Sequence, residues 1–239
     1  MPLIHKTALV TGAGRGLGKA IAERLAQAGC QLALIARNRD ELETLAWQLG
    51  ETYDVKAKAF ACDLSDQSAL FATARAILAE FNSVDVLINN AGTGSYKPFD
   101  EHSVDEHNAI IDVNFKAAVH LTHALLPAMQ AQQQGQIINI ASDLSTRPLA
   151  NMAVYAASKF ALRGFSLSLM REVKEHGIKV GLLNPGIIDT HFNNGTPGHQ
   201  SPANALQPTQ LAETVYQMLT QPQFQMIDEL TIHPQNQDF

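Results

Sequence analysis

Short apolar runs, many of them rich in valine and isoleucine, alternate along the chain with longer segments whose apolar residues recur every three to four positions. The short runs are typical of buried strands, and the longer segments are typical of helices with one apolar face. The pattern predicts about seven strands, at residues 7–10, 32–35, 56–61, 86–88, 137–140, 180–183 and 230–232. It predicts helices near residues 17–28, 42–49, 65–80, 104–129, 154–176 and 209–219.

Several residues indicate where these helices begin or end. Gly29, Gly50 and Gly177 follow predicted helices and are expected to close them, because glycine readily adopts the left-handed conformation that ends a helix. Ser65 is expected to cap the start of the third helix. Pro127 is expected to stop or kink the fourth, since proline removes a backbone donor.

Strands that alternate with helices of this length predict parallel β-α-β units and a sheet covered on both faces. We expect one Rossmann-type, doubly wound α/β domain spanning residues 1–239, with right-handed crossovers. The segment 191–208 breaks the pattern, because it is rich in asparagine, glycine and proline. It directly follows the sixth strand, so we expect it to form a lid over a substrate site.

Composition narrows the class of protein. Hydrophobic residues make up 46% and charged residues 17%, as in a globular chain, and the net charge of −6 argues against a nucleic-acid partner. Cys30 and Cys62 are too few for a disulfide framework and are expected to be reduced, as in a cytoplasmic protein. No signal peptide or membrane span is expected. His120 and His123 share a helix face without further ligands, so no metal site is expected.

A glycine-rich turn separates the first strand from the first helix. Small residues there let the backbone approach a pyrophosphate, and the helix N-terminus adds partial positive charge. The strand before the turn and the helix after it make this a strong indication of a dinucleotide site. The residues expected at the cofactor are Gly12, Gly14, Arg15, Gly16, Leu17 and Gly18.

The end of the second strand indicates which dinucleotide binds. A cofactor with a free ribose 2′-hydroxyl needs a carboxylate there, and Arg37 occupies the region instead. Arg37 and Arg15 could together bind a 2′-phosphate, which favours NADP(H). The alternative is that Arg37 and Arg39 are ordinary solvated residues at a helix start.

A set of motifs over nearly the whole chain resembles the short-chain dehydrogenase/reductase family. These motifs are Thr11-Gly12-x3-Gly16-x-Gly18, Asp63-Leu64, Asn89-Asn90-Ala91-Gly92, Asn114, Ser142, Tyr155-x3-Lys159 and Pro185-Gly186 with Thr190. The resemblance implies a seven-stranded parallel sheet and hydride exchange between a nicotinamide and a carbonyl or alcohol group. It also implies a homodimer or homotetramer.

The expected catalytic residues are Asn114, Ser142, Tyr155 and Lys159. Tyr155 and Lys159 stand one helical turn apart on one face, and a nearby ammonium group lowers a phenol pKa from its usual value of about 10. By resemblance, Tyr155 is the acid, Lys159 holds the ribose, Ser142 binds the substrate oxygen and Asn114 supports a proton relay. Ser145 is a rival for the role of Ser142.

The resemblance also implies further cofactor contacts at the ends of the later strands. Tyr155 and Lys159 are expected to contact the cofactor as well. The other residues of this group are Asp63, Leu64, Asn90, Ala91, Gly92, Pro185, Gly186, Ile188 and Thr190. Asp63 could equally be a stabilising acid at the start of a helix.

The expected substrate lining is mixed, apolar with a few polar groups, and suits a medium-sized carbonyl compound. It comprises residues 93–96, 143–145, Met152, Ile187, His191 and Phe192. We therefore expect an NADPH-dependent carbonyl reductase. The alternatives are a 3-oxoacyl-[acyl-carrier-protein] reductase or sepiapterin-type reductase, an NAD(P)-dependent alcohol dehydrogenase, and a nucleotide-sensing protein without activity. The C-terminal segment 228–234 lacks the glycine-rich strand common in the oxoacyl reductases, which weakens that alternative.

Overall fold

The computed structural model describes residues 3–237 and, for Asn194, the backbone alone. Seven strands form one sheet in the order β3-β2-β1-β4-β5-β6-β7, and every neighbouring pair is parallel. The strands are β1 (Thr7–Thr11), β2 (Gln31–Ala36), β3 (Ala57–Ala61), β4 (Val86–Asn89), β5 (Gly135–Ile140), β6 (Ile178–Pro185) and β7 (Glu229–Ile232). The predicted doubly wound fold is confirmed.

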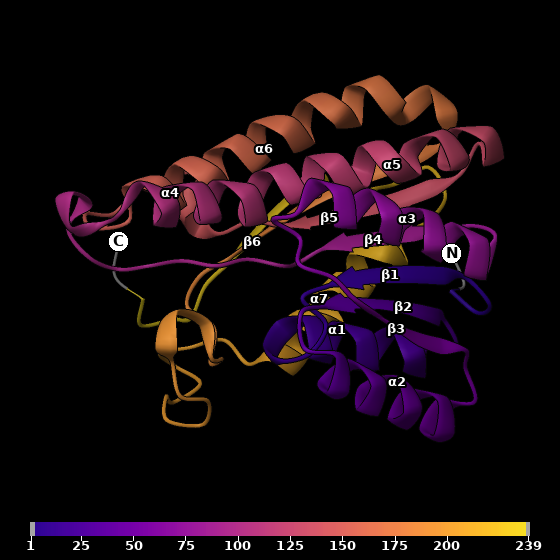
Figure 1. Cartoon of the computed structure of the whole chain (residues 1–239), viewed down its shortest axis with the longest axis horizontal. Helices are drawn as coiled ribbons and strands as arrows, with labels where there is room; N and C mark the ends of the chain where they lie inside the picture. The colour runs from indigo at the N-terminus through magenta and orange to yellow at the C-terminus, as the bar shows by residue number, and fades with distance from the viewer. Residues whose placement is uncertain (1–2, 238–239) are drawn as a thin grey trace.

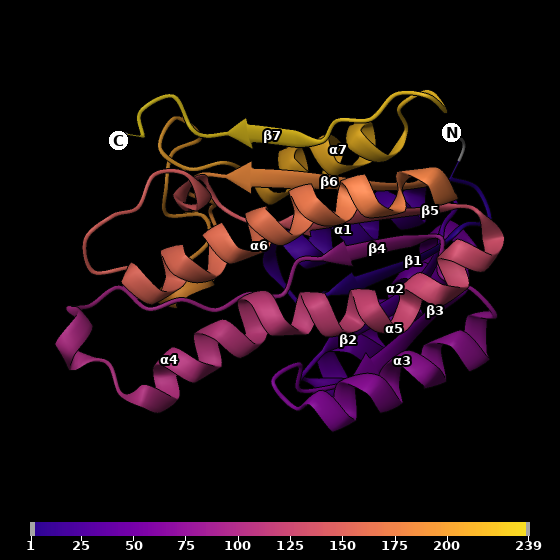
Figure 2. The same ribbon diagram turned by 90° about the horizontal axis from the view of Figure 1, so that it is seen from above.

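Helices cover both faces of the sheet (Figures 1 and 2). One face carries α1 (Gly16–Gln27), α2 (Arg39–Tyr53) and α7 (Pro208–Leu219). The other carries α3 (Gln67–Phe81), α4 (Val104–Ile111), α5 (Ala117–Gln132) and α6 (Ala153–Val173). Among the described residues, no helix is both long and apolar enough to cross a bilayer.

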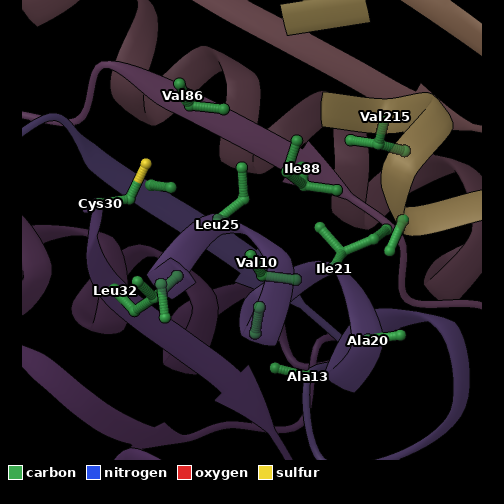
Figure 3. Close-up of a cluster of buried hydrophobic side chains, with 14 of the residues drawn as sticks. Val10, Ala13, Ala20, Ile21, Leu25, Cys30, Leu32, Val86, Ile88 and Val215 are labelled. Carbon is green, nitrogen blue, oxygen red and sulfur yellow. The ribbon is translucent and has the colours of Figure 1, made fainter. Parts of the chain in front are cut away.

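The core lies between the sheet and each helical layer. All five residues of β1 are buried, as expected of a parallel strand covered on both sides. Ile21 and Leu25, one turn apart on α1, point toward Val10 and Ile88 of the sheet, and Val215 of α7 closes the same cluster (Figure 3). Each such side chain contributes about 1.5–3 kcal/mol of burial free energy, which holds α1 against this face of the sheet with its N-terminus at the carboxyl end of β1.

The order of the strands reverses between β1 and β4. From β1 the chain proceeds outward to β2 and β3, and then returns to place β4 on the other side of β1. The connections that leave the carboxyl ends of β1 and β4 therefore diverge toward opposite faces, and a crevice opens between them. The glycine-rich turn follows β1 at this point.

Two helix ends differ from the predictions. The third helix is capped by Asp66, whose carboxylate accepts a hydrogen bond from the Ala69 amide at 3.0 Å, and not by Ser65. The Ser65 hydroxyl is already engaged, because it donates to Asp63. Helix α2 continues through Gly50 and ends at Asp54, which adopts a left-handed conformation with φ 52°.

Pro127 does not stop the fourth predicted helix, since α5 continues past it to Gln132. Pro127 is exposed, so the carbonyl that loses its helical partner can be hydrated. Gly29 and Gly177 do follow helix ends, with φ values of 83° and 67°. Cys30 and Cys62 are free and buried.

Candidate active site

The glycine-rich turn is packed tightly on one side and open on the other. Gly12 has a φ of 65°, and a Cβ added to Gly18 would overlap the carbonyl oxygen of Gly12. A Cβ on Gly14 would instead meet nothing nearer than 3.4 Å, where the Glu41 carboxylate lies. The turn thus presents bare backbone at the start of α1, which fits the binding of a pyrophosphate.

Thr11 joins the two strands that border the crevice. Its Oγ1 accepts hydrogen bonds from the backbone amides of Asn90 and Ala91, at 2.9 and 3.0 Å, and donates to the carbonyl of Ile88 at 3.2 Å. The Asn90 side chain returns a bond to the Thr11 carbonyl at 2.9 Å. These contacts hold the segment after β4 against the end of β1.

A small hollow, partly open to solvent and with room for about one water molecule, lies beside this junction. Its walls include Leu64 and Ala91, two of the expected cofactor contacts, and Asn114. The remaining lining residues are Thr11, Asn89, Val113, Ala117, Ala118 and Leu121.

Arg15 and Arg37 are exposed at the mouth of the crevice, and neither forms a salt bridge within residues 3–237. Arg39, by contrast, pairs with Glu43. Hydrogen bonds from Ser65 lower the pKa of Asp63, and the charge of Arg37 lowers it further. Asp63 and Arg37 therefore lie near each other at this end of the crevice.

Tyr155 and Lys159 extend from the first two turns of α6 and are both buried, with 8% and 4% of their surface exposed. The Lys159 Nζ donates to the carbonyl of Ile140, at the end of β5, at 3.0 Å. It also lies 5.7 Å from the centre of the Tyr155 ring. The predicted pair therefore shares one face at the carboxyl edge of the sheet.

The direction of the Tyr155 pKa differs from the prediction. Burial raises the pKa of Tyr155 to about 12, with a contribution from the Asp143 charge, while the contact with Ser142 opposes the change. Burial also lowers the pKa of Lys159 to about 8. Desolvation is thus the dominant effect in the protein alone, and the phenol is held in its protonated form at neutral pH.

Ser142 stands two residues after the end of β5 and caps the short helix Asp143–Ser145. Its Oγ donates to the Asp143 carboxylate at 2.9 Å and accepts from the Leu144 amide at 3.2 Å. Ser145, its rival, is fully buried and donates to the side chain of Asn184 at 3.1 Å. Ser142, and not Ser145, is the serine that contacts Tyr155.

Asn114 lies in a π-helical turn, Asp112–Lys116, that joins α4 to α5, and not in the uninterrupted helix that the pattern predicted. Its side chain accepts from the Thr93 amide at 2.8 Å, and it donates to the Thr93 carbonyl at 2.8 Å and to Ser158 at 3.0 Å. Single π turns occur frequently at functional sites. The sequence analysis gave Ser158 no role, although this residue stands between Tyr155 and Lys159.

The remaining predicted residues gather where β6 ends. Gly92 faces the catalytic group, since a Cβ there would lie 3.7 Å from Lys159 Nζ. Thr190 lies against Gly16, whose added Cβ would be 3.3 Å from the threonine methyl. Ile188 pairs with Leu206 in an isolated bridge. The segment after β6 and the glycine-rich turn therefore approach each other across the crevice.

The segment 191–208 is a loop with one short helix, Phe192–Asn194, and lies beside the site (Figure 1). Its base is anchored because both oxygens of Asp189 accept from the Gly198 amide, at 3.0 and 2.9 Å. Phe192 covers Tyr155, with ring centroids 5.6 Å apart. Gly94 leaves the room for this contact, since a Cβ there would lie 2.8 Å from the Phe192 ring.

The C-terminal segment also reaches the site, which the sequence did not indicate. The side-chain amide of Gln237 donates to Asp143, and its oxygen accepts from the Ile187 amide at 2.9 Å. Gly186 leaves the space for this side chain, because an added Cβ would overlap it. Asp143 was expected in the substrate lining, whereas Gln237 carried no motif.

Comparison with known proteins finds relatives over almost the whole chain. The model of the family described as short chain dehydrogenase matches residues 6–200. An uncharacterized oxidoreductase of Staphylococcus epidermidis is 34% identical over 230 residues, covering 96% of this chain and 97% of that protein.

Two solved structures are similar over almost the whole chain. An alcohol dehydrogenase from Thermococcus sibiricus, complexed with 5-hydroxy-NADP, has a TM-score of 0.93 and 31% identity and covers 98% of each chain. The L-sorbose reductase from Gluconobacter frateurii, complexed with NADPH and L-sorbose, has a TM-score of 0.88 and 28% identity, also over 98% of each chain.

Proposed function

Because this chain belongs to the short-chain dehydrogenase/reductase family, we propose that it reduces a ketone or aldehyde with NADPH, with Tyr155 as the proton donor. One observation carries the proposal. The buried phenol of Tyr155 stands with Ser142 and Lys159 at the carboxyl edge of the sheet, at the end of a crevice that begins with bare glycine backbone. Ligands bind at this edge in open α/β sheets.

Two kinds of observation support NADPH as the cofactor. Arg15 and Arg37 are exposed near the glycine-rich turn and have no salt-bridge partner among the described residues, so both can pair with a phosphate. The two similar structures named above hold NADP-type dinucleotides. The glycine-rich turn would hold the pyrophosphate, and Lys159 and the segment after β6 would hold the nicotinamide half.

The residues of the site divide the chemistry between them. Bound NADPH supplies the two electrons and the hydrogen that the carbonyl carbon receives. Ser142 hydrogen-bonds the carbonyl oxygen, and Tyr155 gives that oxygen a proton as negative charge develops on it. The raised pKa of Tyr155 suits a donor, because the proton is present throughout the neutral range. Lys159 and Asn114 position the tyrosine and its helix, and Phe192 excludes water from above.

The test is the loss of NADPH absorbance with a panel of diketones, pterins, oxoacyl thioesters and aldehydes. We expect Tyr155→Phe to bind NADPH as tightly as the unchanged protein and to lose turnover by roughly 10²–10⁴-fold. Tyr53→Phe, at the end of α2, is the matched control and should retain turnover. Turnover retained by Tyr155→Phe would show that another group donates the proton, and a panel without any substrate would refute the reductase.

A further inference from the structure

We propose that Asp143 selects the substrate of this site by accepting a hydrogen bond from a hydroxyl group on the carbon next to the carbonyl. The preferred substrates are then α-hydroxy ketones and α-hydroxy aldehydes. This inference rests on the proposed reductase function and deepens it.

Asp143 is a carboxylate kept out of water without a cation. It is 4% exposed and directly follows Ser142. None of the salt bridges within residues 3–237 involves it. A buried carboxylate needs hydrogen-bond donors to offset its loss of hydration, and its two oxygens can accept several. The hydrogen-bond donors around Asp143 must therefore replace the hydration that its carboxylate has lost.

The first donor is Ser142, whose hydroxyl bonds to Asp143 Oδ1 at 2.9 Å. A serine hydroxyl has one proton. While that proton points to Asp143, Ser142 cannot donate to a substrate carbonyl. A substrate hydroxyl that donates to Asp143 would replace this bond and free the Ser142 proton for the carbonyl oxygen. The Oγ of Ser142 and the Oδ1 of Asp143 lie 2.9 Å apart. The carbonyl and hydroxyl oxygens of an α-hydroxy ketone are also adjacent, so each can pair with one of these two atoms.

The second donor is Gln237, whose amide bonds to the other oxygen of Asp143. The same side chain accepts from the Ile187 amide at 2.9 Å, at the edge of the expected substrate lining. Gln237 is thus a neutral donor placed against the carboxylate beside the catalytic serine. A substrate hydroxyl is also a neutral donor, so replacing the Ser142 bond with it leaves the charge of the site unchanged.

The charge of Asp143 also indicates what the site disfavours. A substrate carboxylate or phosphate next to the carbonyl would lie against a buried negative charge, which is strongly unfavourable. A ketone without this hydroxyl cannot donate to Asp143. The Ser142 proton would then stay bonded to Asp143 and would not reach the carbonyl oxygen. Sites built to bond a hydroxyl discriminate strongly against the analogue that lacks it, because their polar groups are then left unpaired.

The experiment compares hydroxyacetone with acetone, which differ by one hydroxyl group. For each, kcat/KM is measured with NADPH for the unchanged protein, for Asp143→Asn and for the control Asp54→Asn. Asp54 is an exposed helix-ending residue whose left-handed conformation asparagine tolerates. We expect hydroxyacetone to be preferred and Asp143→Asn to reduce that preference by roughly 10–100-fold, the range for a hydrogen bond to a charged group. Asp54→Asn should leave the preference unchanged.

A binding measurement accompanies the kinetics. Calorimetry on Tyr155→Phe, which should not turn the alcohols over, with the oxidised cofactor present should show propylene glycol binding at least about tenfold more tightly than isopropanol, and adding Asp143→Asn should remove the difference. Gln237→Ala removes the donor to the other oxygen of Asp143 and leaves the bond from Ser142 in place, so it should preserve the preference for hydroxyacetone.

The outcomes separate the two proposals. Equal use of hydroxyacetone and acetone, or a preference that Asp143→Asn leaves intact, overturns the role of Asp143 while the reductase stands. Failure of every carbonyl in the wider panel overturns the reductase, and the substrate preference with it.

Discussion

The ring of Phe192, from the loop after β6, lies 5.6 Å from the ring of Tyr155 and is tilted by 56° to it. The phenylalanine is 40% exposed, whereas the tyrosine beneath it is 8% exposed. The loop therefore supplies one wall of the environment in which the phenol titrates. Burial is the largest cause of the raised pKa of Tyr155, so a change in Phe192 should change the protonation of the proposed acid.

We expect Phe192→Ala to lower the pKa of Tyr155 from its value of about 12, because water then reaches the phenolate and stabilises it. Reduction needs the protonated phenol, so activity falls as pH rises through this pKa. The alkaline limb of kcat/KM should therefore move to lower pH. Phe224→Ala, at a side chain that is 95% exposed, is the control. An unmoved alkaline limb in Phe192→Ala would contradict this account of the phenol.

Arg37→Ala should weaken NADPH binding by about 1–3 kcal/mol, the range for charge-assisted hydrogen bonds, and leave NADH binding nearly unchanged. The measurement is the dissociation constant of each dinucleotide. Arg39→Ala is a close control, because Arg39 stands two positions along and pairs with Glu43. Equal losses for both dinucleotides would mean that Arg37 does not bind the 2′-phosphate.

Gly18→Ala should destabilise the fold by about 1–3 kcal/mol, because the new methyl overlaps the Gly12 carbonyl and forces the turn outward. Dinucleotide binding should weaken with it. Gly164→Ala on α6 is the matched control, since a Cβ there meets nothing within 4 Å. Alanine at a helix interior is favoured over glycine by about 1 kcal/mol, so this variant should be more stable. Thermal unfolding of both variants checks the prediction, and equal midpoints would refute it.

Glu229 connects β7 to the rest of the fold. Arg163 donates two hydrogen bonds to its carboxylate, at 2.7 and 2.9 Å, and Asn184 donates a third at 2.8 Å. The bond from Arg163 is the main cause of the lowered pKa of Glu229. A lowered folded-state pKa gives stability that is complete above the unfolded value of about 4.3 and is lost as pH falls through the folded value.

Glu229→Gln should therefore lower the free energy of unfolding by about 1–3 kcal/mol at neutral pH and by less below pH of about 4. Denaturant unfolding at several pH values measures this difference. Glu43→Gln, in the exposed pair with Arg39, should change stability by about 0.5 kcal/mol or less. A loss for Glu229→Gln that persists unchanged at acid pH would show that the charge is not its source.

The fold could be predicted from the chain because its signals are local and repeated. Each buried strand is an apolar run next to a helix with one apolar face, and the parallel arrangement follows from their alternation. Helix ends were harder, because competing side chains decide them. Ser65 and Asp66 are both good caps, and only the bond from Ser65 to Asp63 leaves the cap to Asp66.

The site could be predicted only where a motif marks it. Tyr155 and Lys159 share one helix, while Ser142 and Asn114 come from two other parts of the chain, and the structure brings all four to one edge of the sheet. The Gln237 contact could not be foreseen, because it joins residues far apart in the chain and depends on the side-chain space left by Gly186. The direction of the Tyr155 pKa in the protein alone also differs from the prediction, since its largest cause is burial in the folded chain.

The π turn at Asp112–Lys116 should make this stretch of the chain sensitive to the number of its residues. A π turn holds one more residue than an α turn, and so resembles an α-helix into which one residue has been inserted. Deleting a single residue there would let α4 and α5 merge into one regular helix, and the residues of the turn, Asn114 among them, would change the direction in which they point. The amide of Asn114 would then lose Thr93 and Ser158 together, so this short stretch should tolerate substitutions far better than any change in its number of residues.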